Sequence, residues 1–403
     1  MNDFRCKYDV AVLGGGVAGT AAAIQAARCG AKTVLLEKSV LLGGLATTGL
    51  IYVYLPLCNG YGHQTTFGIA EEMLKASMKY GPGEIPKWEE NKQGKSLERY
   101  FVSFSPASFA LALDEMCENA GVDLWFDTLI SKGVVDDSGK LSSVYVENKS
   151  GRGIIEADIF IDASGDADVS RSVQKVEYEA SNNYLSSWVL EYDVRAKESE
   201  PYILADKLGR FILQKRSSEI NKEIDGHKVS SFLLESRRKI REHYLNEYAK
   251  NEVDRHQFFP LVLPAMTSFR KTYAIRGKKI LTSGQEHTFF EDSIGIVADW
   301  RYPGQIWEIP YGTLVPEKIN GLLTAGRCIS SFGDAWEATR VIPAAAMTGQ
   351  VAGMAAALAV ETSKQPGSLD VKVLQNRLRA EGFMLHCSEL AQNNKKMECQ
   401  KEK

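Results

Sequence analysis

The chain opens with an apolar strand-like run, a run of small residues and a second apolar run. Val10, Val12 and Leu13 are typical of a buried parallel strand. The small apolar residues Ala21 to Ala27 then predict a helix, and Thr33 to Leu36 predict the second strand. A strand, a helix and a strand within about 30 residues predict a βαβ unit and therefore a parallel sheet.

The pattern changes after the first hundred residues. Ser105 to Ala120 predicts a helix, because Ser105 is a good N-cap residue, Pro106 suits the first turn and Gly121 follows the end. Three strand-like runs come next, and they predict a meander rather than a second βαβ unit: Val122 to Leu129, Leu141 to Glu147 and Gly153 to Glu156. An apolar run, Ala157 to Ile161, then ends in an acidic, small-residue turn, Asp162 to Asp168.

From about Val176 to Trp307 aromatic residues are frequent and charges come in bursts, such as Arg237 to Arg241. Only Ser231 to Lys250 looks helical there, so we interpret residues 176–307 as an inserted second domain. The chain then returns to an extended run, a strand leading into a turn, a long helix and one more helix: Ile309 to Pro316, Leu322 to Arg327, Arg340 to Val360 and Leu369 to Leu390. The predicted division is therefore residues 1–175 with 308–365, residues 176–307, and a C-terminal helix and tail over residues 366–403.

The turn after the first strand carries the clearest chemical signal. Gly14, Gly16 and Gly19 form G-x-G-x-x-G between a predicted strand and a predicted helix. These glycines allow a tight turn, the approach of a pyrophosphate and close helix packing, and the free N–H groups of the helix favour an anion. Glu37 ends the second strand about 20 residues on, where an acid accepts hydrogen bonds from a ribose. We therefore predict a dinucleotide site rather than an ordinary glycine-rich turn.

Composition and charge narrow the class of protein. The chain is 44% hydrophobic and 25% charged with a net charge of −3, so bulk charge indicates neither a nucleic acid nor an anionic membrane as a partner. Met1 to Lys7 carries charges of both signs and does not resemble a signal peptide. The long apolar stretch Val341 to Val360 contains Pro343 and Gln350, which favours a buried helix over a membrane span.

The seven cysteines are scattered, and none forms C-x-x-C or another metal-ligand spacing. We therefore expect reduced thiols, a cytoplasmic location and no metal site.

Four segments together give a family resemblance: the opening fingerprint, Leu42 to Gly49, Ile161 to Asp168, and Ile309 to Met354. The chain resembles FAD-dependent oxidoreductases of the glutathione-reductase-type superfamily. More narrowly, it is similar to a bacterial family related to succinate-dehydrogenase flavoproteins. This resemblance implies an α/β fold, with a Rossmann-like FAD-binding domain and an inserted α+β substrate domain.

The resemblance also implies where FAD is held. The ADP half would lie against Gly14, Gly16 to Gly19, Glu37 and Gly44, with the turn around Asp162 to Gly165 near the pyrophosphate or adenosine. The ribityl chain would approach Gly326 to Cys328, and the isoalloxazine would meet Arg340 to Ala344. The implied cofactor-binding residues are Gly14, Gly16, Val17, Ala18, Gly19, Glu37, Lys38, Gly43, Gly44, Leu45, Ala163, Ser164, Gly165, Asp166, Gly326, Arg327, Arg340, Val341, Pro343 and Ala344.

What this sequence lacks narrows the chemistry. A second dinucleotide fingerprint and a redox cysteine pair after Gly44 are both missing, which argues against a pyridine-nucleotide disulfide reductase. Residues 37–42 contain no histidine of the kind that attaches FAD covalently in succinate-dehydrogenase relatives. We therefore expect non-covalent FAD and no dedicated NAD(P)H domain.

Candidates for substrate chemistry come from the predicted inserted domain and its borders. Arg270 and Arg301 are candidate anion clamps, because a guanidinium presents paired donors, and His287 and Tyr311 are candidate proton carriers. Each has an ordinary structural alternative, as do four weaker candidates: His63, Tyr273, Arg276 and Cys328. The expected partner is a small organic substrate, with an anionic one among the expectations.

The sequence therefore predicts an oxidoreductase that transfers a hydride or an electron pair between an organic molecule and FAD. Two alternatives stay open. The first is a flavoprotein that uses FAD structurally or as an electron carrier for an unidentified acceptor partner. The second is an NAD-only dehydrogenase, against which the four-segment resemblance argues. The substrate and the oligomeric state do not follow from the sequence.

Overall fold

The computed structural model describes residues 4–86, 99–178, 184–198, 204–216 and 224–390. One seven-stranded sheet organises the fold, with strand order β5-β2-β1-β8-β7-β6 and β16 paired beside β8. Its strands are β1 (Phe4–Leu13), β2 (Thr33–Leu36), β5 (Asp123–Trp125), β6 (Leu129–Val135), β7 (Leu141–Asn148), β8 (Gly151–Asp162) and β16 (Leu322–Thr324). The strands β5, β2, β1, β8 and β16 are parallel, whereas β6, β7 and β8 form an antiparallel meander.

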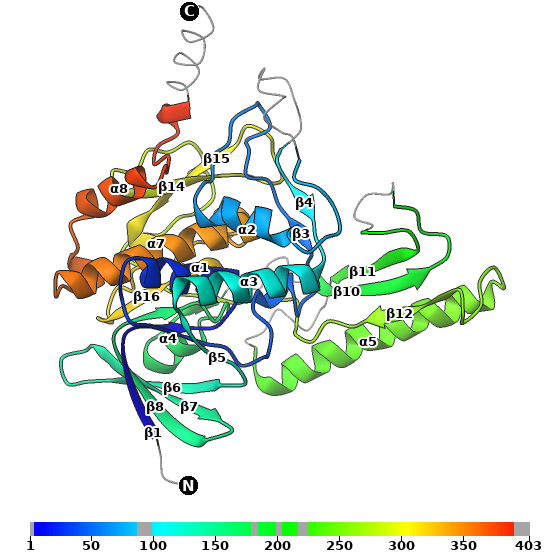
Figure 1. The fold of residues 1–403 in the computed structure, drawn as a ribbon, viewed down its shortest axis with the longest axis horizontal. Coiled ribbons are helices and arrows are strands. Elements are labelled where there is room, and N and C mark those ends of the chain that lie inside the picture. Colours follow the sequence, from blue (N-terminus) through cyan, green and yellow to red (C-terminus); the bar gives the residue numbers. More distant parts are fainter. Residues whose placement is uncertain (1–3, 87–98, 179–183, 199–203, 217–223, 391–403) are drawn as a thin grey trace, which may run out of the picture.

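Helices α1 and α7 lie side by side against this sheet, with α3 next to α1 (Figure 1). The helices are α1 (Val17–Arg28), α2 (Ile69–Ser77), α3 (Pro106–Ala120), α4 (Asp168–Val173), α5 (Gly226–Ala249), α6 (Gly333–Thr339), α7 (Ile342–Glu361) and α8 (Val371–Ala380). The predicted cap of α3 is confirmed, since the Ser105 side chain accepts a hydrogen bond from the Ser108 N–H and Gly121 ends the helix at φ 76°.

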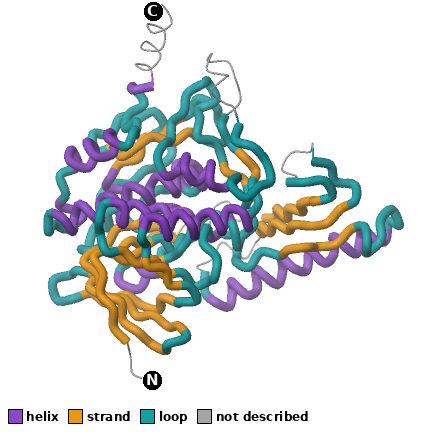
Figure 2. Tube along the Cα trace, viewed as in Figure 1, coloured by secondary structure: helices purple, strands orange, loops and turns teal. Residues whose placement is uncertain are grey.

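The remaining strands form four small sheets. The largest has three strands in the order β11-β10-β12, and Figure 2 shows it apart from the large sheet, with a long helix alongside. The strands are β10 (Tyr184–Asp193), β11 (Leu208–Arg216) and β12 (Phe258–Val262), and the helix is α5. The two-stranded sheets pair β3 (Val53–Tyr54) with β4 (Val102–Ser103), β9 (Glu177–Tyr178) with β13 (Tyr273–Ala274), and β14 (Ser293–Ala298) with β15 (Ile306–Pro310).

Small residues hold α7 against α1. A Cβ on Gly349 would stand 2.1 Å from the Ala18 carbonyl oxygen, and one on Gly353 would stand 2.2 Å from that of Ala22. The two contacts advance together along both helices, so α1 and α7 run parallel. Gly349 lies level with Ala18, near the start of α1, but α7 already begins at Ile342. The N-terminus of α7 therefore extends about 9 Å beyond the N-terminus of α1. Both positive helix ends therefore face the same region.

Several predicted boundaries change. The run Val122 to Leu129 is not part of the meander, because β5 pairs in parallel with β2 and the meander begins at β6. Tyr311 to Thr313 form a 3₁₀ turn rather than extended chain, since the Tyr311 carbonyl accepts the Leu314 N–H at 2.9 Å. The last predicted helix is shorter, because Gly382 at φ 86° follows α8.

The predicted domain division stays a prediction. Strand β14 lies within the predicted inserted domain and β15 crosses its predicted boundary at residue 307, yet both contribute side chains to the largest core cluster together with α7. The predicted tail beyond Leu390 lies outside the described residues.

Between α5 and the three-stranded sheet lies a buried carboxyl group. Glu191 is 6% exposed, and its side chain accepts a hydrogen bond from the Tyr244 hydroxyl at 2.8 Å. Burial raises the pKa of Glu191 to about 7, although the Tyr244 hydrogen bond works against the shift. The His243 ring stands 3.9 Å from the same carboxylate, and burial lowers the pKa of that histidine.

This environment predicts a pH-dependent gain in stability for Glu191→Gln. Between the ordinary pKa of 4.5 and the folded value of about 7, the folded state binds more protons at Glu191 than the unfolded state does. Stability from this residue therefore falls as pH rises through that range, by on the order of 3 kcal/mol in total. The glutamine side chain does not titrate in this pH range, and its amide oxygen can still accept the hydrogen bond from the Tyr244 hydroxyl.

Urea unfolding of both proteins from pH 4 to pH 8 measures this difference, which we expect to grow as pH rises and to level off above pH 7. His243 contributes an opposite slope, because burial lowers its pKa. The control is Glu242→Gln, which removes an exposed carboxyl group on α5. A difference that stays constant with pH would show that the pKa of Glu191 is the same in the folded and unfolded states.

Candidate functional site

The predicted fingerprint turn lies between β1 and α1, and its three glycines have different surroundings. A Cβ on Gly14, which has φ 104°, would stand 2.8 Å from the Ala163 carbonyl oxygen, and one on Gly19 would stand 1.8 Å from the Gly14 carbonyl oxygen. A Cβ on Gly16 would meet nothing within 4 Å. Gly14 and Gly19 are therefore required by the fold itself, whereas Gly16 borders open space at the start of α1.

Glu37 reaches back to this turn from the end of β2. Its carboxylate accepts the Gly15 N–H at 2.7 Å and the Ser39 N–H at 2.8 Å, and the side chain is largely buried. Each oxygen keeps a lone pair for another donor. The acid is thus fixed beside the turn with capacity to accept hydrogen bonds from ribose hydroxyls.

The second glycine segment packs directly on the first. Gly43, at φ 98°, donates its N–H to the Gly15 carbonyl at 2.8 Å, and a Cβ on Gly44 would stand 3.1 Å from the Gly16 Cα. Thr48 follows, and its carbonyl accepts the Ala265 N–H at 2.8 Å. The loop therefore connects the turn to the segment that follows β12.

The acidic turn after β8 is a scaffold. Asp162 is fully buried and accepts four hydrogen bonds, from the N–H and hydroxyl groups of Ser164 and Ser170, at 2.6–3.1 Å. Ala163 packs against Gly14 and Gly19. The carboxylate of Asp162 thus shapes the turn around residues 163–166 rather than facing open space.

Arg327 joins that turn to the segment before β13. It donates to the Gly165 carbonyl at 2.8 Å, to the Asp166 carboxylate at 2.7 Å and to the Phe269 carbonyl. Its side chain is 8% exposed, so the guanidinium is engaged mainly by protein. Next to it, Cys328 is fully buried, and burial raises the pKa of its thiol well above the usual range.

A buried cluster of charged side chains lies where α7 begins. Arg340 donates to one oxygen of Glu337 from Nε at 2.9 Å and from Nη2 at 2.5 Å. The Lys271 ammonium lies 3.5 Å from the other oxygen, which has no hydrogen bond. Glu337 is 6% exposed and Lys271 is 1% exposed. Burial favours the neutral acid, but Arg340, Lys271 and Arg270 together hold the pKa of Glu337 below its usual range.

This cluster changes how Arg340 is interpreted. The family resemblance implied that Arg340 meets the isoalloxazine, and the structure shows that its guanidinium pairs with Glu337. Sequence reasoning missed Lys271 altogether. The available signal was its place within the charge burst from Arg270 to Lys279, but nothing there distinguishes a buried lysine from its exposed neighbours.

The four predicted catalytic residues are not brought together by the contacts of the described residues. Arg270 precedes Lys271, and its positive charge helps to lower the pKa of Glu337. Arg301 is held by Asp299 and Asp334, each at 2.8 Å. His287 is exposed, and the buried Tyr311 hydroxyl donates to the Pro366 carbonyl at 3.0 Å.

The weaker candidates Tyr273, Arg276 and His63 also form contacts with other protein groups. The Tyr273 hydroxyl bonds to both backbone groups of Ile224, and Arg276 pairs with Glu177 at 3.7 Å. His63 is bound through its backbone to Asn59, and burial lowers the pKa of its ring.

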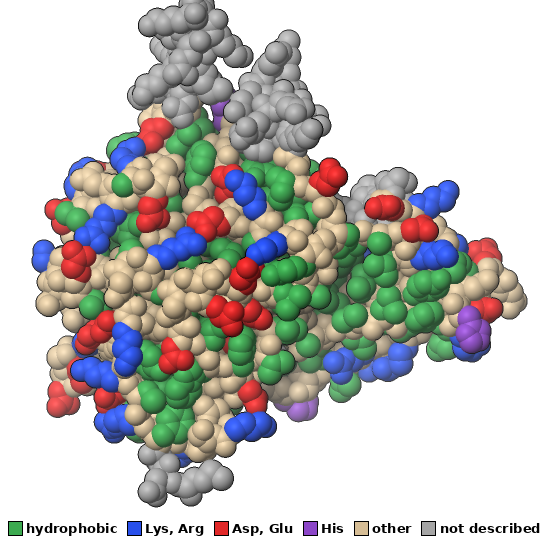
Figure 3. All heavy atoms as spheres, in the orientation of Figure 1, with side chains coloured by type: hydrophobic (Ala, Val, Ile, Leu, Met, Phe, Trp, Pro, Cys, Tyr) green, Lys and Arg blue, Asp and Glu red, His purple; other side chains and the backbone are tan. Residues whose placement is uncertain are grey.

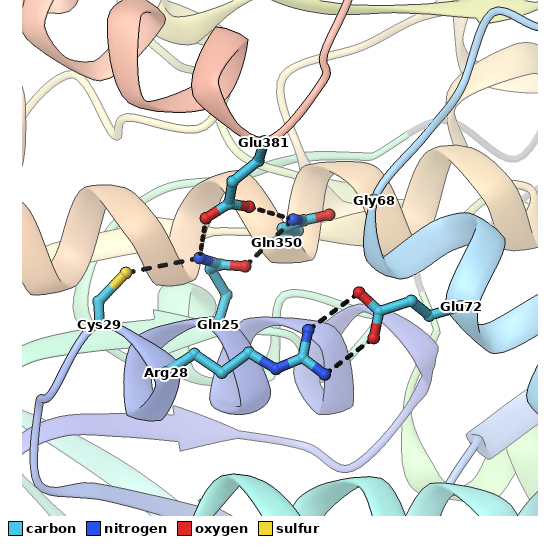
Figure 4. Close-up of a pocket in the computed structure, with 7 residues that line it drawn as sticks. All are labelled: Gln25, Arg28, Cys29, Gly68, Glu72, Gln350 and Glu381. Atoms are coloured by element: carbon cyan, nitrogen blue, oxygen red, sulfur yellow. Dashed lines mark hydrogen bonds and ion pairs between the residues drawn. The ribbon is translucent and has the colours of Figure 1, made fainter.

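A cavity of about 340 Å³ opens at the opposite end of α1 (Figure 4). Glu381 accepts from Gln25 at 2.8 Å and from Gln350 at 2.7 Å, while Arg28 pairs with Glu72. These contacts connect α1, α2, α7 and the end of α8. We interpret the cavity as a structural junction, because its polar side chains already bind each other.

One helix in the described part of the chain, α7, is long and apolar enough to span a membrane by length and composition. In the fold 94% of its apolar window is buried inside the protein. The prediction of a buried helix is therefore confirmed.

Comparison with known proteins gives a family and a fold. The family described as FAD dependent oxidoreductase matches residues 9–186 and 173–378. No curated protein matches the chain.

Among solved structures, a geranylgeranyl bacteriochlorophyll reductase-like protein from Thermoplasma acidophilum matches with a TM-score of 0.50 and 14% identity, over 94% of this chain and 84% of that one. CabE, an aromatic hydroxylase from angucycline biosynthesis, matches with a TM-score of 0.50 and 12% identity, over 97% of this chain and 72% of that one. At such low identity these similarities support the fold alone.

Proposed function

The chain belongs to the FAD-dependent oxidoreductase family, and we propose that it transfers a hydride or an electron pair between a small organic molecule and non-covalently bound FAD. The observation that carries this proposal is the parallel packing of α1 and α7. It directs two positive helix ends to one region, beside the open space at Gly16. An elongated dinucleotide with a pyrophosphate and a flavin matches this arrangement.

In this proposal the residues have separate roles toward FAD. The free N–H groups at the start of α1 bind the pyrophosphate above Gly16, and Glu37 accepts hydrogen bonds from the ribose. Val341 and Pro343 begin α7, whose N–H groups favour negative charge on the flavin. When bound, the flavin supplies the redox chemistry, and the chain supplies position and charge.

We place the substrate between the flavin region and the three-stranded sheet. In β10, Trp188 and Leu190 alternate with Val189 and Glu191, which lie on the α5 side, so the first two occupy the opposite sheet face. The Trp188 ring meets Tyr52 edge-on at 5.7 Å, just beyond the second glycine segment. An aromatic sheet face, with the Arg210 guanidinium 4.4 Å from the centre of the Trp188 ring, thus lies next to the cofactor loop.

We propose further that the substrate is anionic. The start of α7 gathers the basic groups of Lys271 and Arg340, with Arg270 close enough to influence Glu337. A carboxylate or other anion next to these groups would be stabilised. Arg270 therefore remains our candidate anion clamp, whereas catalytic roles for His287, Arg301 and Tyr311 stay predictions from the sequence.

Anaerobic titration of the FAD-loaded protein with a panel of metabolites tests the proposed activity. A free-standing oxidoreductase is expected to bleach its flavin with at least one small molecule alone, and most readily with an anionic one. Bleaching only in the presence of a second protein would favour the alternative of a partner-dependent electron carrier. A cytoplasmic location is part of this proposal, on the basis of the sequence.

We predict that the purified protein is yellow and releases FAD on heat or acid denaturation. The reason is that residues 37–42 offer no histidine for covalent attachment. Absorption and fluorescence of the supernatant after denaturation measure the released flavin. Flavin that stays in the protein pellet would contradict non-covalent binding.

NADH and NADPH are predicted to reduce the flavin slowly or not at all. The sequence has one dinucleotide fingerprint, which the proposal assigns to FAD. Stopped-flow mixing of each nucleotide with the oxidised protein under anaerobic conditions measures the rate, with dithionite as the positive control. Rapid stoichiometric bleaching by either nucleotide would point to a reductase instead.

A further inference from the structure

The outward face of α5 has an unusual composition. The helix buries Phe232, Ser236, Ile240 and Tyr244, which repeat every four residues. The opposite face carries five exposed side chains at positions i, i+3, i+4, i+7 and i+11, which share one side of a helix. We call them the α5 ridge: Leu234, Arg237, Arg238, Arg241 and Leu245.

The arginines of the α5 ridge have no ion pair or hydrogen bond among the described residues. Two of the nearby acids are engaged, since Glu242 pairs with Lys239 at 2.7 Å and Glu247 pairs with both Arg195 and Lys250. Glu235, three residues before Arg238, forms no ion pair among the described residues. Three positive charges thus face solvent without neutralisation. The charge burst noted in the sequence is a surface feature of this helix.

The two leucines of the α5 ridge are more exposed than apolar side chains usually are. Leu234 is 57% exposed and Leu245 is 62% exposed, with the arginines between them. They lie about 16 Å apart along a helix of roughly 36 Å. An additional exposed apolar run, Leu261 to Leu263, lies at the end of β12, each residue being 44% exposed.

The α5 ridge lies at the edge of the molecule. Figure 1 shows α5 along the periphery with β12 beside it, and the Tyr248 hydroxyl donates to the Phe258 carbonyl between them. Figure 3 shows hydrophobic side chains gathered over this part of the molecule, with Lys and Arg along the edge where α5 runs. Because α5 is straight and lies at the periphery, its outward face can contact a flat surface along the length of the helix.

We propose that the α5 ridge docks the protein on an anionic lipid bilayer. The arginines would contact lipid phosphates and carboxylates, and the two leucines would enter between the headgroups. An acidic protein would also attract the arginines, but it would need two apolar sites at the matching separation, whereas any bilayer offers them. Because the net charge of the chain is −3, the attraction is local and fixes the orientation of the molecule. The proposal is independent of the proposed redox activity.

Sedimentation of the FAD-loaded full chain with vesicles tests this surface. The vesicles contain phosphatidylcholine with about 30% phosphatidylserine, or phosphatidylcholine alone, at low ionic strength. We expect binding to the anionic vesicles, release by about 0.5 M salt, and little binding to the neutral ones. The triple variant Arg237→Ala, Arg238→Ala, Arg241→Ala is expected to lower the partition coefficient at least about tenfold.

A charge-matched control removes three exposed basic groups elsewhere: Arg5→Ala, Lys149→Ala and Arg152→Ala. It is expected to bind within about twofold of the native protein, since those groups lie in β1, in β8 and at the β7–β8 turn rather than on α5. Leu234→Ser with Leu245→Ser is expected to weaken binding severalfold without changing its salt dependence.

Equal losses in the control and ridge variants would overturn the proposal, as would absence of vesicle binding. Binding to polyglutamate without binding to vesicles would assign the ridge to an acidic protein partner. Should the arginine triple variant fold poorly, the leucine variant and the salt dependence of the native protein still decide the question.

Discussion

Gly16→Val is expected to abolish FAD binding and to leave the protein folded. A valine here would project into the open space above the start of α1, where the pyrophosphate has to approach the backbone. Apart from the adjacent backbone, no atom of the described residues lies within 4 Å of the added Cβ, and Gly16 has φ −65°, so the folded chain tolerates the new side chain. We expect an increase in the dissociation constant for FAD of at least about a hundredfold, since an anion contact with helix N–H groups is lost.

The measurement is FAD content after purification, followed by fluorescence titration of the apoprotein, with unfolding monitored in parallel. Gly226→Val is a matched control, because a Cβ there also meets nothing within 4 Å and the residue begins α5, away from the cofactor region. Gly19→Ala is expected to fail differently, by misfolding, since its Cβ would overlap the Gly14 carbonyl oxygen. Full flavin content in a folded Gly16→Val protein would mean that the fingerprint has been misread.

Arg340→Met is expected both to destabilise the protein and to make its flavin harder to reduce. Removing the guanidinium leaves the buried Glu337 carboxylate with Lys271 at 3.5 Å and with the weaker influence of Arg270. Losing one member of a buried ion pair costs about 3 kcal/mol of folding free energy. The lost positive charge also raises the cost of negative charge on the flavin. A change of ~1.4 kcal/mol in a two-electron couple corresponds to about 30 mV.

Redox titration and urea unfolding of a double-mutant cycle separate these two effects. Glu337→Gln alone is expected to make the flavin easier to reduce, and the double variant is expected to lie between the two single variants in potential and to recover part of the stability. Arg377→Met is the matched control, because Arg377 pairs with Glu361 at the far end of α7. Unchanged potentials across the cycle, with full FAD occupancy, would leave Arg340 a structural role only.

Local patterns were sufficient where one segment both folds and defines the chemistry. The strand, turn and helix from β1 to α1 occupy the predicted places, and Ser105, Pro106 and Gly121 bound α3 as expected. The two glycine segments were predicted to share a ligand, and they pack on each other through Gly43 and Gly15. Backbone sterics and capping act over a few residues, so they can be recognised in a single sequence.

Contacts between distant segments did not follow from local patterns. The pairing of β5 with β2, and of Lys271 with Glu337, joins residues far apart in the chain. Without the fold, an arginine or lysine in a charge-rich stretch looks the same whether it is buried, as Lys271 is, or exposed, as Arg237 is. The sequence therefore gives the sign of each charge, but not whether the side chain is buried or which group it pairs with.

The sequence by itself determined the class of this protein: a dinucleotide fingerprint, a family resemblance and the absence of a second fingerprint. Only the tertiary structure decided that α1 and α7 run parallel, that Arg340 pairs with Glu337, and that three arginines of α5 face solvent with no partner among the described residues. The physical reason is that burial and electrostatic partners depend on which segments meet in space. Small residues such as Gly349 permit that meeting, but they do not identify the partner, which the packing of the whole chain selects.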